Sequence, residues 1–265
     1  MKLTHELLGP VEIPEEPHRI VSLAPNVTAT IYALGAGERL VGRSAFCWRP
    51  EEAQELPVVA SYTKVRWDLL EELRPEVIFT TSGIQRQTTL ALGERGWPVW
   101  TFPLPVSPWG IIETVSAVAA FLGVDGARLA GELAERYQAL AGALAGVRVY
   151  LEYQLGEPIT IGRGAFMNAA LEHLGAANVF ADRAQAYFPP PLSEIPARRP
   201  DLLVLEPKRI KNRAAQLEGL RQALAQRGWP EIPWLATGGD ELSHSGPEFF
   251  GYLEEFVASA RRLIG

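Results

Sequence analysis

The chain carries one rare tetrapeptide twice, in "ERGWPVWTFP" at Glu94–Pro103 and in "QRGWPEIPWLAT" at Gln226–Thr237. A string such as Arg-Gly-Trp-Pro is not expected to recur by chance in 265 residues. In each copy the glycine follows a helical pattern, which it is suited to end, and an apolar strand pattern comes next. The same structural element is therefore predicted at two places in the chain.

Two further pairs of segments repeat in the same order. "EELRPEVIFTT" at Glu71–Thr81 resembles "PARRPDLLVLE" at Pro196–Glu206, and each copy predicts a helix that ends before Arg-Pro. "YALGAGERLVG" at Tyr32–Gly42 resembles "EHLGAANVFAD" at Glu172–Asp182, where Leu-Gly fits a left-handed helix end. These matches predict two related halves. One continuous domain with a fortuitous duplication remains open.

The strands predicted in each half are apolar on both faces. They are "RIVSLA" (19–24), "EVIFTT" (76–81), "RVYLEY" (148–153) and "DLLVLE" (201–206). Such strands occur in sheets that helices cover on both sides, and their alternation with helical segments is typical of α/β proteins. The sequence therefore predicts two similar α/β lobes.

Residues 107–123 and 125–146 predict two consecutive helices between the lobes. Because no Gly/Ser-rich linker joins the halves, the connection is predicted to be stiff. We therefore expect an N-terminal lobe over 1–105, a helical spacer with a long rigid helix over 106–146, and a C-terminal lobe over 147–265.

Composition excludes several classes of protein. The net charge of −6 and the lack of a strong Lys/Arg cluster argue against a nucleic-acid partner. The single Cys47 excludes a disulfide framework and a zinc ligand set. No apolar stretch reaches transmembrane length, and no signal peptide is recognisable at Met1, so we expect no membrane insertion. A soluble protein is expected: periplasmic or at the cell surface if a leader was trimmed, cytoplasmic if Met1 is the native start.

"EPHRIVSLAPNVTATIYALGAGERLVGRS" at Glu16–Ser44 resembles the opening of a known family. These are the class III, helical-backbone solute-binding proteins of metal-chelate ABC importers, which bind cobalamin, haem or ferric siderophores. "IGRGAFMNAALEHLGAANVFAD" at Ile161–Asp182 resembles the opening of their second lobe, and the cobalamin-binding members look most similar. The resemblance covers nearly the whole chain. It implies two lobes, one long connecting helix and a ligand held in the cleft between the lobes.

Candidate ligand-binding residues follow from the positions of the loops. In open α/β sheets, ligands bind beyond the carboxyl ends of the strands. Several loops there carry aromatic side chains, which suit a large planar ligand, and the resemblance places Trp48, Tyr62 and Tyr187 at the cleft aromatics of cobalamin binders. Asn26 is also expected to cap a helix. The candidates are Pro25, Asn26, Trp48, Tyr62, Arg66 and Gly83 in the first lobe, and Phe166, Tyr187, Phe188, Asp240 and His244 in the second.

Two of these residues are candidate metal ligands only if the bound chelate is haem. The resemblance places Tyr62 where haem binders carry a tyrosine that ligates iron. His244, in a Gly/Ser-rich loop where family members often have arginine, offers an imidazole that can ligate a metal. We expect no intrinsic cofactor, and the bound ligand is expected to be a corrinoid or another metal chelate.

The resemblance also implies a partner. Importer-coupled members carry in each lobe an acidic residue seven positions before the proline of the Pro-Asp/Glu strand, which docks on the permease. Asp68 fits in the first lobe, whereas the second lobe has Ser193 at that position and Glu194 one residue along. We expect Asp68 and Glu194 to contact ABC importer permease subunits. The shifted carboxylate leaves open a cytoplasmic chelate-binding protein that is not coupled to a permease.

The sequence thus favours a monomeric solute-binding protein that captures a corrinoid first, and haem or a ferric siderophore next. It is not expected to be an enzyme, because Gly-x-Ser-x-Gly, phosphate-loop and His-Glu-x-x-His motifs do not occur. The alternative is a metal-cofactor enzyme on a related two-lobed fold. That function needs several Cys, His or carboxylate ligands.

Overall fold

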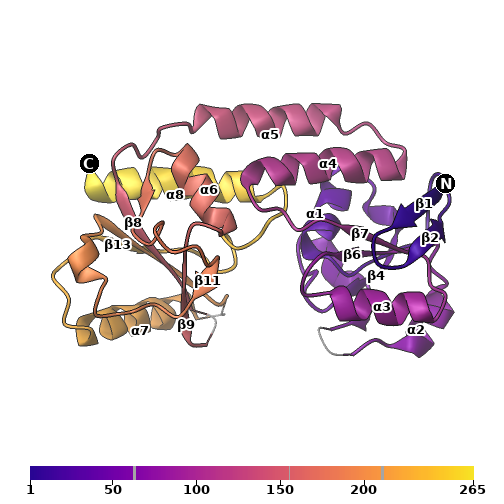
Figure 1. Cartoon of the computed structure of the whole chain (residues 1–265), viewed down its shortest axis with the longest axis horizontal. Helices are drawn as coiled ribbons and strands as arrows, with labels where there is room; N and C mark the ends of the chain where they lie inside the picture. Colours follow the sequence, from indigo (N-terminus) through magenta and orange to yellow (C-terminus); the bar gives the residue numbers. More distant parts are fainter. Residues whose placement is uncertain (62–63, 155, 210–211) are drawn as a thin grey trace. The chain divides into compact units, whose positions relative to one another are not determined.

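The computed structural model describes residues 1–61, 64–154, 156–209 and 212–265. These residues form two compact α/β units (Figure 1). The first comprises Met1–Pro105, Trp109–Ala134 and Ser245–Pro247, and the second comprises Val106–Pro108, Glu135–His244 and Glu248–Gly265. The stretch expected as a separate spacer is shared: α4 (Pro108–Leu122) lies almost wholly in the first unit, and α5 (Ala127–Ala139) runs from the first into the second.

The first unit is built on a five-stranded sheet whose strands are all parallel. Helices follow the strands and cover both faces, and an antiparallel hairpin of β1 (Lys2–His5) and β2 (Gly9–Glu12) precedes them. The sheet order is β5 (Val58–Ala60), β4 (Leu40–Ser44), β3 (Ile20–Ser22), β6 (Val77–Thr81), β7 (Val99–Phe102). The helices are α1 (Pro25–Ala33), α2 (Trp67–Leu73), α3 (Arg86–Glu94) and α4, with 3₁₀ turns at Gly37–Arg39 and Glu51–Glu55.

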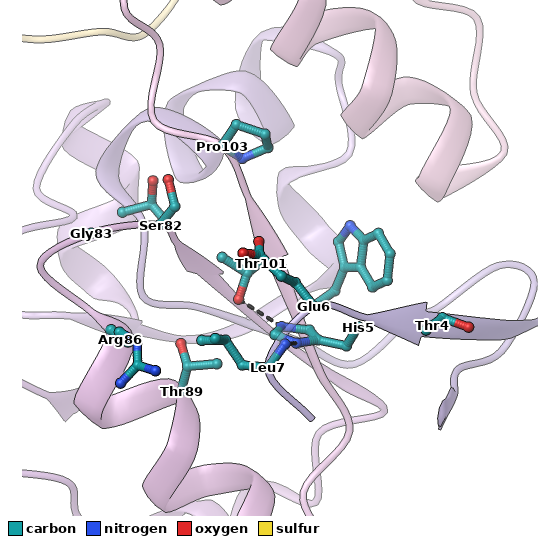
Figure 2. A pocket seen from close by; sticks show the side chains of 12 residues that line it. Thr4, His5, Glu6, Leu7, Ser82, Gly83, Arg86, Thr89, Thr101 and Pro103 are labelled. Carbon is teal, nitrogen blue, oxygen red and sulfur yellow. Dashed lines mark hydrogen bonds between the residues drawn. The ribbon is translucent and has the colours of Figure 1, made fainter. Parts of the chain in front are cut away.

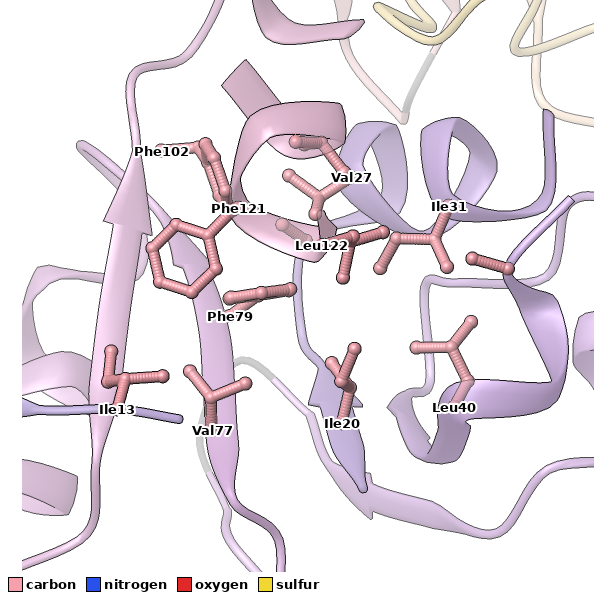
Figure 3. Packing of buried hydrophobic residues seen from close by; sticks show 13 residues of the cluster. Ile13, Ile20, Val27, Ile31, Leu40, Val77, Phe79, Phe102, Phe121 and Leu122 are labelled. Carbon is pink, nitrogen blue, oxygen red and sulfur yellow. The ribbon is translucent and has the colours of Figure 1, made fainter. Parts of the chain in front are cut away.

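Alternate residues of the central strands enter two separate cores. Phe79 of β6 packs on one face with Val27 of α1 and Phe121 of α4, as Figure 3 shows. Its neighbour Ile78 packs on the other face against Leu92 of α3. Because successive side chains of a strand point to opposite faces, burial on both sides explains the continuous apolar runs in the sequence.

The second unit contains a mixed sheet. Its parallel part is β10 (Ala177–Asn178), β8 (Arg148–Gln154), β12 (Leu202–Pro207) and β13 (Trp234–Ala236). β9 (Pro158–Ile161) runs antiparallel to β8, and β11 (Tyr187–Phe188) runs antiparallel to β9. The helices are α6 (Phe166–His173), α7 (Arg213–Gln226) and α8 (Phe249–Ile264). None of the helices in the described ranges has the length and apolar content needed to cross a bilayer.

The repeats seen in the sequence correspond to repeated structure. The order β4-β3-β6-β7 in the first unit matches β10-β8-β12-β13 in the second. Gly96 and Gly228, of the two Arg-Gly-Trp-Pro copies, both have positive φ, at 77° and 63°. Arg74 and Arg199, each before a proline, adopt left-handed conformations with φ of 45° and 48°. The prediction of two similar α/β lobes is confirmed.

Three local predictions were wrong. The helix expected to continue to Gly146 ends at Ala139, because turns follow, with Gly142 at a φ of 68°. The segment before Arg199 forms only a 3₁₀ turn, Pro196–Arg198. Asn26 is not a helix cap: α1 begins at Pro25, which suits the first helical position, and Ala24 is the cap.

The two arginines of the repeated tetrapeptide have different surroundings. Arg227 is largely buried and donates two hydrogen bonds, of 2.9 and 2.7 Å, to Glu152, whose side chain is fully buried. Tyr150 and Gln154 also donate to this carboxylate. Arg95 is exposed and stacks 4.0 Å above the ring of Trp67. Only the second unit therefore uses this arginine to neutralise a buried charge.

We predict unequal costs for the same substitution at these repeated positions. Arg227→Gln should lower the free energy of unfolding by about 3 kcal/mol, because Glu152 would remain buried without its cation. Arg95→Gln should cost less than about 1 kcal/mol, since only an exposed stacking contact is lost. Urea unfolding followed by circular dichroism measures both values. Equal costs would contradict this assignment.

Candidate functional site

In the first unit, the loops that follow β3, β4, β5 and β6 lie at one edge of the sheet, because these strands are parallel. A cavity of only ≈ 10 Å³ marks where they meet. Its lining combines Leu23 after β3, Phe46 after β4, Ser61 after β5 and Ile84 after β6. We call this side of the sheet the carboxyl edge of the first unit.

Three predicted ligand residues lie at this edge around α1 and the loop after β6. Pro25 begins α1, and Gly83 is exposed with a φ of 85°. Asn26 is only 3% exposed, and its Nδ2 has no hydrogen-bond partner among the described residues. Buried amide donors are seldom left unpaired, so Asn26 offers a donor to a group at this edge.

Trp48 and Arg66 lie in the loops after β4 and β5. Trp48 is half-buried, and the Arg49 guanidinium lies 4.4 Å above its ring. Arg66 is exposed at the start of α2, where its Nη2 lies 3.6 Å from Asp68 Oδ2. The predicted residue Tyr62 lies outside the described residues.

Two exposed apolar residues at this edge were not among the candidate ligand residues. Ile84, after β6, is 69% exposed, and Leu104, after β7, is 48% exposed. The backbone N–H of Leu104 donates to Ser82 Oγ at 3.0 Å, which ties the two loops together. A sequence signal was present, because both are large aliphatic residues within polar or proline-rich turns. Exposed apolar side chains that gather in one place are typical of interaction surfaces.

In the second unit, Glu206 anchors the loop that follows β13. Glu206 is 1% exposed at the end of β12. Its carboxylate accepts hydrogen bonds from the N–H groups of Leu242 (2.6 Å), Ser243 (2.8 Å) and Glu241 (3.3 Å). Thr237 Oγ1 donates a fourth, at 3.1 Å. One buried side chain thus fixes the loop that carries Asp240 and His244, a role that sequence reasoning did not assign.

Burial raises the pKa of Glu206, although the hydrogen bonds from Ser243 and Leu242 oppose the shift. Its negative charge also contributes to a raised pKa of the buried Tyr153, after the larger effect of burial. Tyr153 lies beneath Tyr187, with 6.2 Å between the ring centroids. Glu206 and Tyr153 are therefore two buried polar side chains on paired strands, and Tyr153 contacts the exposed Tyr187.

The two predicted aromatics of β11 differ in exposure. Tyr187 is 54% exposed, and its ring can contact a ligand. Phe188 packs instead against Phe180, at 5.6 Å between centroids, as part of the core of the second unit.

Asp240 and His244 occupy the loop that Glu206 holds. Asp240 has a φ of 57° and accepts a hydrogen bond of 3.1 Å from Ser243 Oγ. His244 is 7% exposed, and its Nε2 lies 3.4 Å from Glu248 Oε2. This carboxylate is the acidic group beside the nitrogen that would ligate a metal.

Phe166 does not lie where the sequence placed it. Phe166 was predicted to lie in a loop at the carboxyl edge because β9 was expected to be a parallel strand. Because β9 is antiparallel to β8, the chain beyond Ile161 runs toward the amino end of β8. Phe166 is also buried, with its ring 4.9 Å from that of Phe249. It contributes to the core and not to the carboxyl edge.

The two carboxylates predicted to dock on a permease differ in exposure and in their ion pairs. Asp68, in the first turn of α2, has a side chain that is 78% exposed. Glu194 is 44% exposed and lies between two arginines, 3.3 Å from Arg183 and 3.2 Å from Arg198. Asp68 is the more accessible negative charge.

The described residues contain no group of three or more His, Cys, Asp or Glu that could hold a metal ion. The site residues instead combine exposed aliphatic and aromatic side chains with a few fixed polar groups.

Known proteins share this architecture. A cobalamin-binding protein of Halobacterium salinarum is 30% identical over 207 residues, which cover 73% of this chain and 55% of that protein. The chain thus spans about half the length of this relative. The fold matches the solved periplasmic haem-binding protein of Roseiflexus with a TM-score of 0.79 at 21% identity, over 95% of this chain and 100% of the other. It matches the periplasmic vitamin B12 binding protein of Vibrio cholerae with a TM-score of 0.76 at 20% identity, over 94% and 99%.

The sequence profile described as periplasmic binding protein matches residues 20–238, which is most of the chain. The chain belongs to the periplasmic binding protein family.

Proposed function

We propose that this protein captures a metal chelate, a corrinoid first and haem or a ferric siderophore next, for an ABC importer. The observation that carries the proposal is a pair of exposed aliphatic side chains, Ile84 and Leu104, in two loops at the carboxyl edge of the first unit. Such side chains suit the rim of a large macrocycle better than a small hydrated ion. The cobalamin-binding relative supports the corrinoid as the first choice.

Polar groups with fixed positions complete the proposed binding surface. The amide of Asn26 offers an unpaired donor in the first unit, and Glu206 holds the loop of Asp240 in the second. A corrinoid carries many amide groups, and each needs a hydrogen-bonding partner when it leaves water. That both units contribute to one ligand site stays a prediction, which rests on the family resemblance.

The proposed transport role includes docking on a permease through Asp68. This carboxylate is exposed and bears one ion pair of 3.6 Å, which contributes little at a surface. Glu194 would have to leave two arginines before it could contact a partner. We therefore infer that the first unit provides the stronger of the two docking charges.

Calorimetric titration with cyanocobalamin, haemin and a ferric siderophore tests the ligand class. We expect saturable, tight binding of cyanocobalamin. Ile84→Ala and Tyr187→Ala should each weaken it about tenfold or more, because a buried apolar contact is lost. Leu263→Ala is the matched control, since Leu263 is 45% exposed near the end of α8 and belongs to neither set of candidate ligand residues. Binding of a bare metal ion or a sugar, with none of the three chelates bound, would disprove the ligand class.

The anchoring role of Glu206 gives a second prediction. Glu206→Gln places an amide group against backbone N–H donors, so at least one of them loses its acceptor. We expect about a tenfold loss of chelate affinity and faster proteolysis within residues 237–244. Glu218→Gln, on the exposed face of α7, should change neither. An unchanged affinity for Glu206→Gln would show that this loop takes no part in binding.

Tyr62→Phe separates a corrinoid from haem. If a corrinoid is bound, only the ring of Tyr62 packs on it, and loss of the hydroxyl costs about 1 kcal/mol. If haem is bound, the phenolate bond to iron disappears, together with its charge-transfer absorption. We expect the small effect. Loss of the ligand's colour in the Tyr62→Phe variant would favour haem.

A further inference from the structure

A second hollow of the first unit lies beside the β1–β2 hairpin and borders the loops after β6 and β7. A cavity of ≈ 380 Å³ lies between the β1–β2 hairpin, strands β6 and β7, and helix α3 (Figure 2). This volume falls within the range of small-molecule sites. Among its lining residues only Gly83 belongs to the candidate chelate-binding set.

One wall of the cavity is a chain of hydrogen bonds. Leu7 N–H donates to His5 Nδ1 at 3.0 Å, so the ring proton lies on Nε2, which donates to Thr101 Oγ1 at 2.8 Å. Thr101 and Thr80 share a bond of 2.7 Å, and Thr89 donates to Thr80 at 3.0 Å. These groups supply one N–H and three O–H hydrogens for three bonds. One hydroxyl hydrogen is therefore left over.

The unused hydrogen belongs to Thr101. Thr80 is fully buried and accepts from Thr89, so its own hydroxyl is expected to donate to Thr101. Thr101 lines the cavity and is partly exposed, so its hydroxyl hydrogen is available to an acceptor in the cavity. Burial lowers the pKa of His5, and the negative charge of Glu6 opposes this shift.

One positively charged and one negatively charged side chain line the cavity. Arg86, at the start of α3, and Glu6, just after β1, are both exposed lining residues. Neither belongs to any ion pair found in the described part of the chain. Trp100 and Pro103 add apolar surface to the lining. A ligand that carries both charges on an apolar body matches this lining.

We propose that this cavity binds a small zwitterion with a carboxylate, an ammonium group and an apolar body, such as an aromatic amino acid. The carboxylate accepts hydrogen bonds from Arg86 and from the Thr101 hydroxyl. The ammonium group donates to Glu6, and the apolar body packs on Trp100. The zwitterion does not require a bound chelate, although Gly83 borders both proposed sites.

Three related probes test the proposal by titration calorimetry. L-Phenylalanine carries both charges, hydrocinnamate lacks the ammonium group, and phenethylamine lacks the carboxylate. We expect phenylalanine to bind most tightly. Arg86→Gln should weaken phenylalanine and hydrocinnamate about tenfold and leave phenethylamine unchanged, because a charge-assisted bond to the carboxylate is lost. Glu6→Gln should weaken phenylalanine and phenethylamine and spare hydrocinnamate. Thr101→Val should weaken the two probes that carry a carboxylate, phenylalanine and hydrocinnamate.

Arg221→Gln, an exposed arginine of α7, is the matched control and should change none of these affinities. Cyanocobalamin is titrated into the same variants, so that failure of the chelate proposal is seen separately. The zwitterion proposal is overturned if phenylalanine shows no saturable binding. It is equally overturned if Arg86→Gln and Glu6→Gln do not separate the probes by charge.

Discussion

Parallel pairing of β3 with β4 and β6 positions the loops of the proposed chelate site in the first unit. Because the strands run the same way, the loops that follow them reach one edge, where residues from four loops line one small cavity. The pairing depends on burial of both faces, which the alternating side chains of β6 provide through Phe79 and Ile78. Exposed Ile84 and buried Asn26 are thereby brought to the same edge.

The second unit repeats this arrangement but is held by charge as well as by apolar packing. Glu152 and Glu206 are both buried on neighbouring strands, β8 and β12. Arg227 neutralises the first, whereas backbone N–H groups satisfy the second. Buried carboxylates are costly unless every oxygen is paired. The first unit instead contains the hydrogen-bonded chain His5–Thr101–Thr80–Thr89, in which no carboxylate takes part.

Much of the fold could be predicted because backbone conformation is encoded locally. Gly96 and Gly228 were expected to end helices, and both have the positive φ that glycine permits. Strand direction is not encoded locally: "PITI" at Pro158–Ile161 is apolar whether it runs parallel or antiparallel. The antiparallel course of β9 moved Phe166 away from the predicted edge. Glu206 gave no signal either, because its role depends on a loop more than thirty residues away.

Amide hydrogen exchange with and without bound cyanocobalamin tests most directly whether the carboxyl edges bind the ligand. The account predicts slower exchange in residues 45–48, 82–85 and 237–244 when the ligand is present. It predicts no change in residues 36–39 and 123–126, which lie at turns before β4 and α5. Slower exchange confined to those turns, with the three loop segments unaffected, would contradict it.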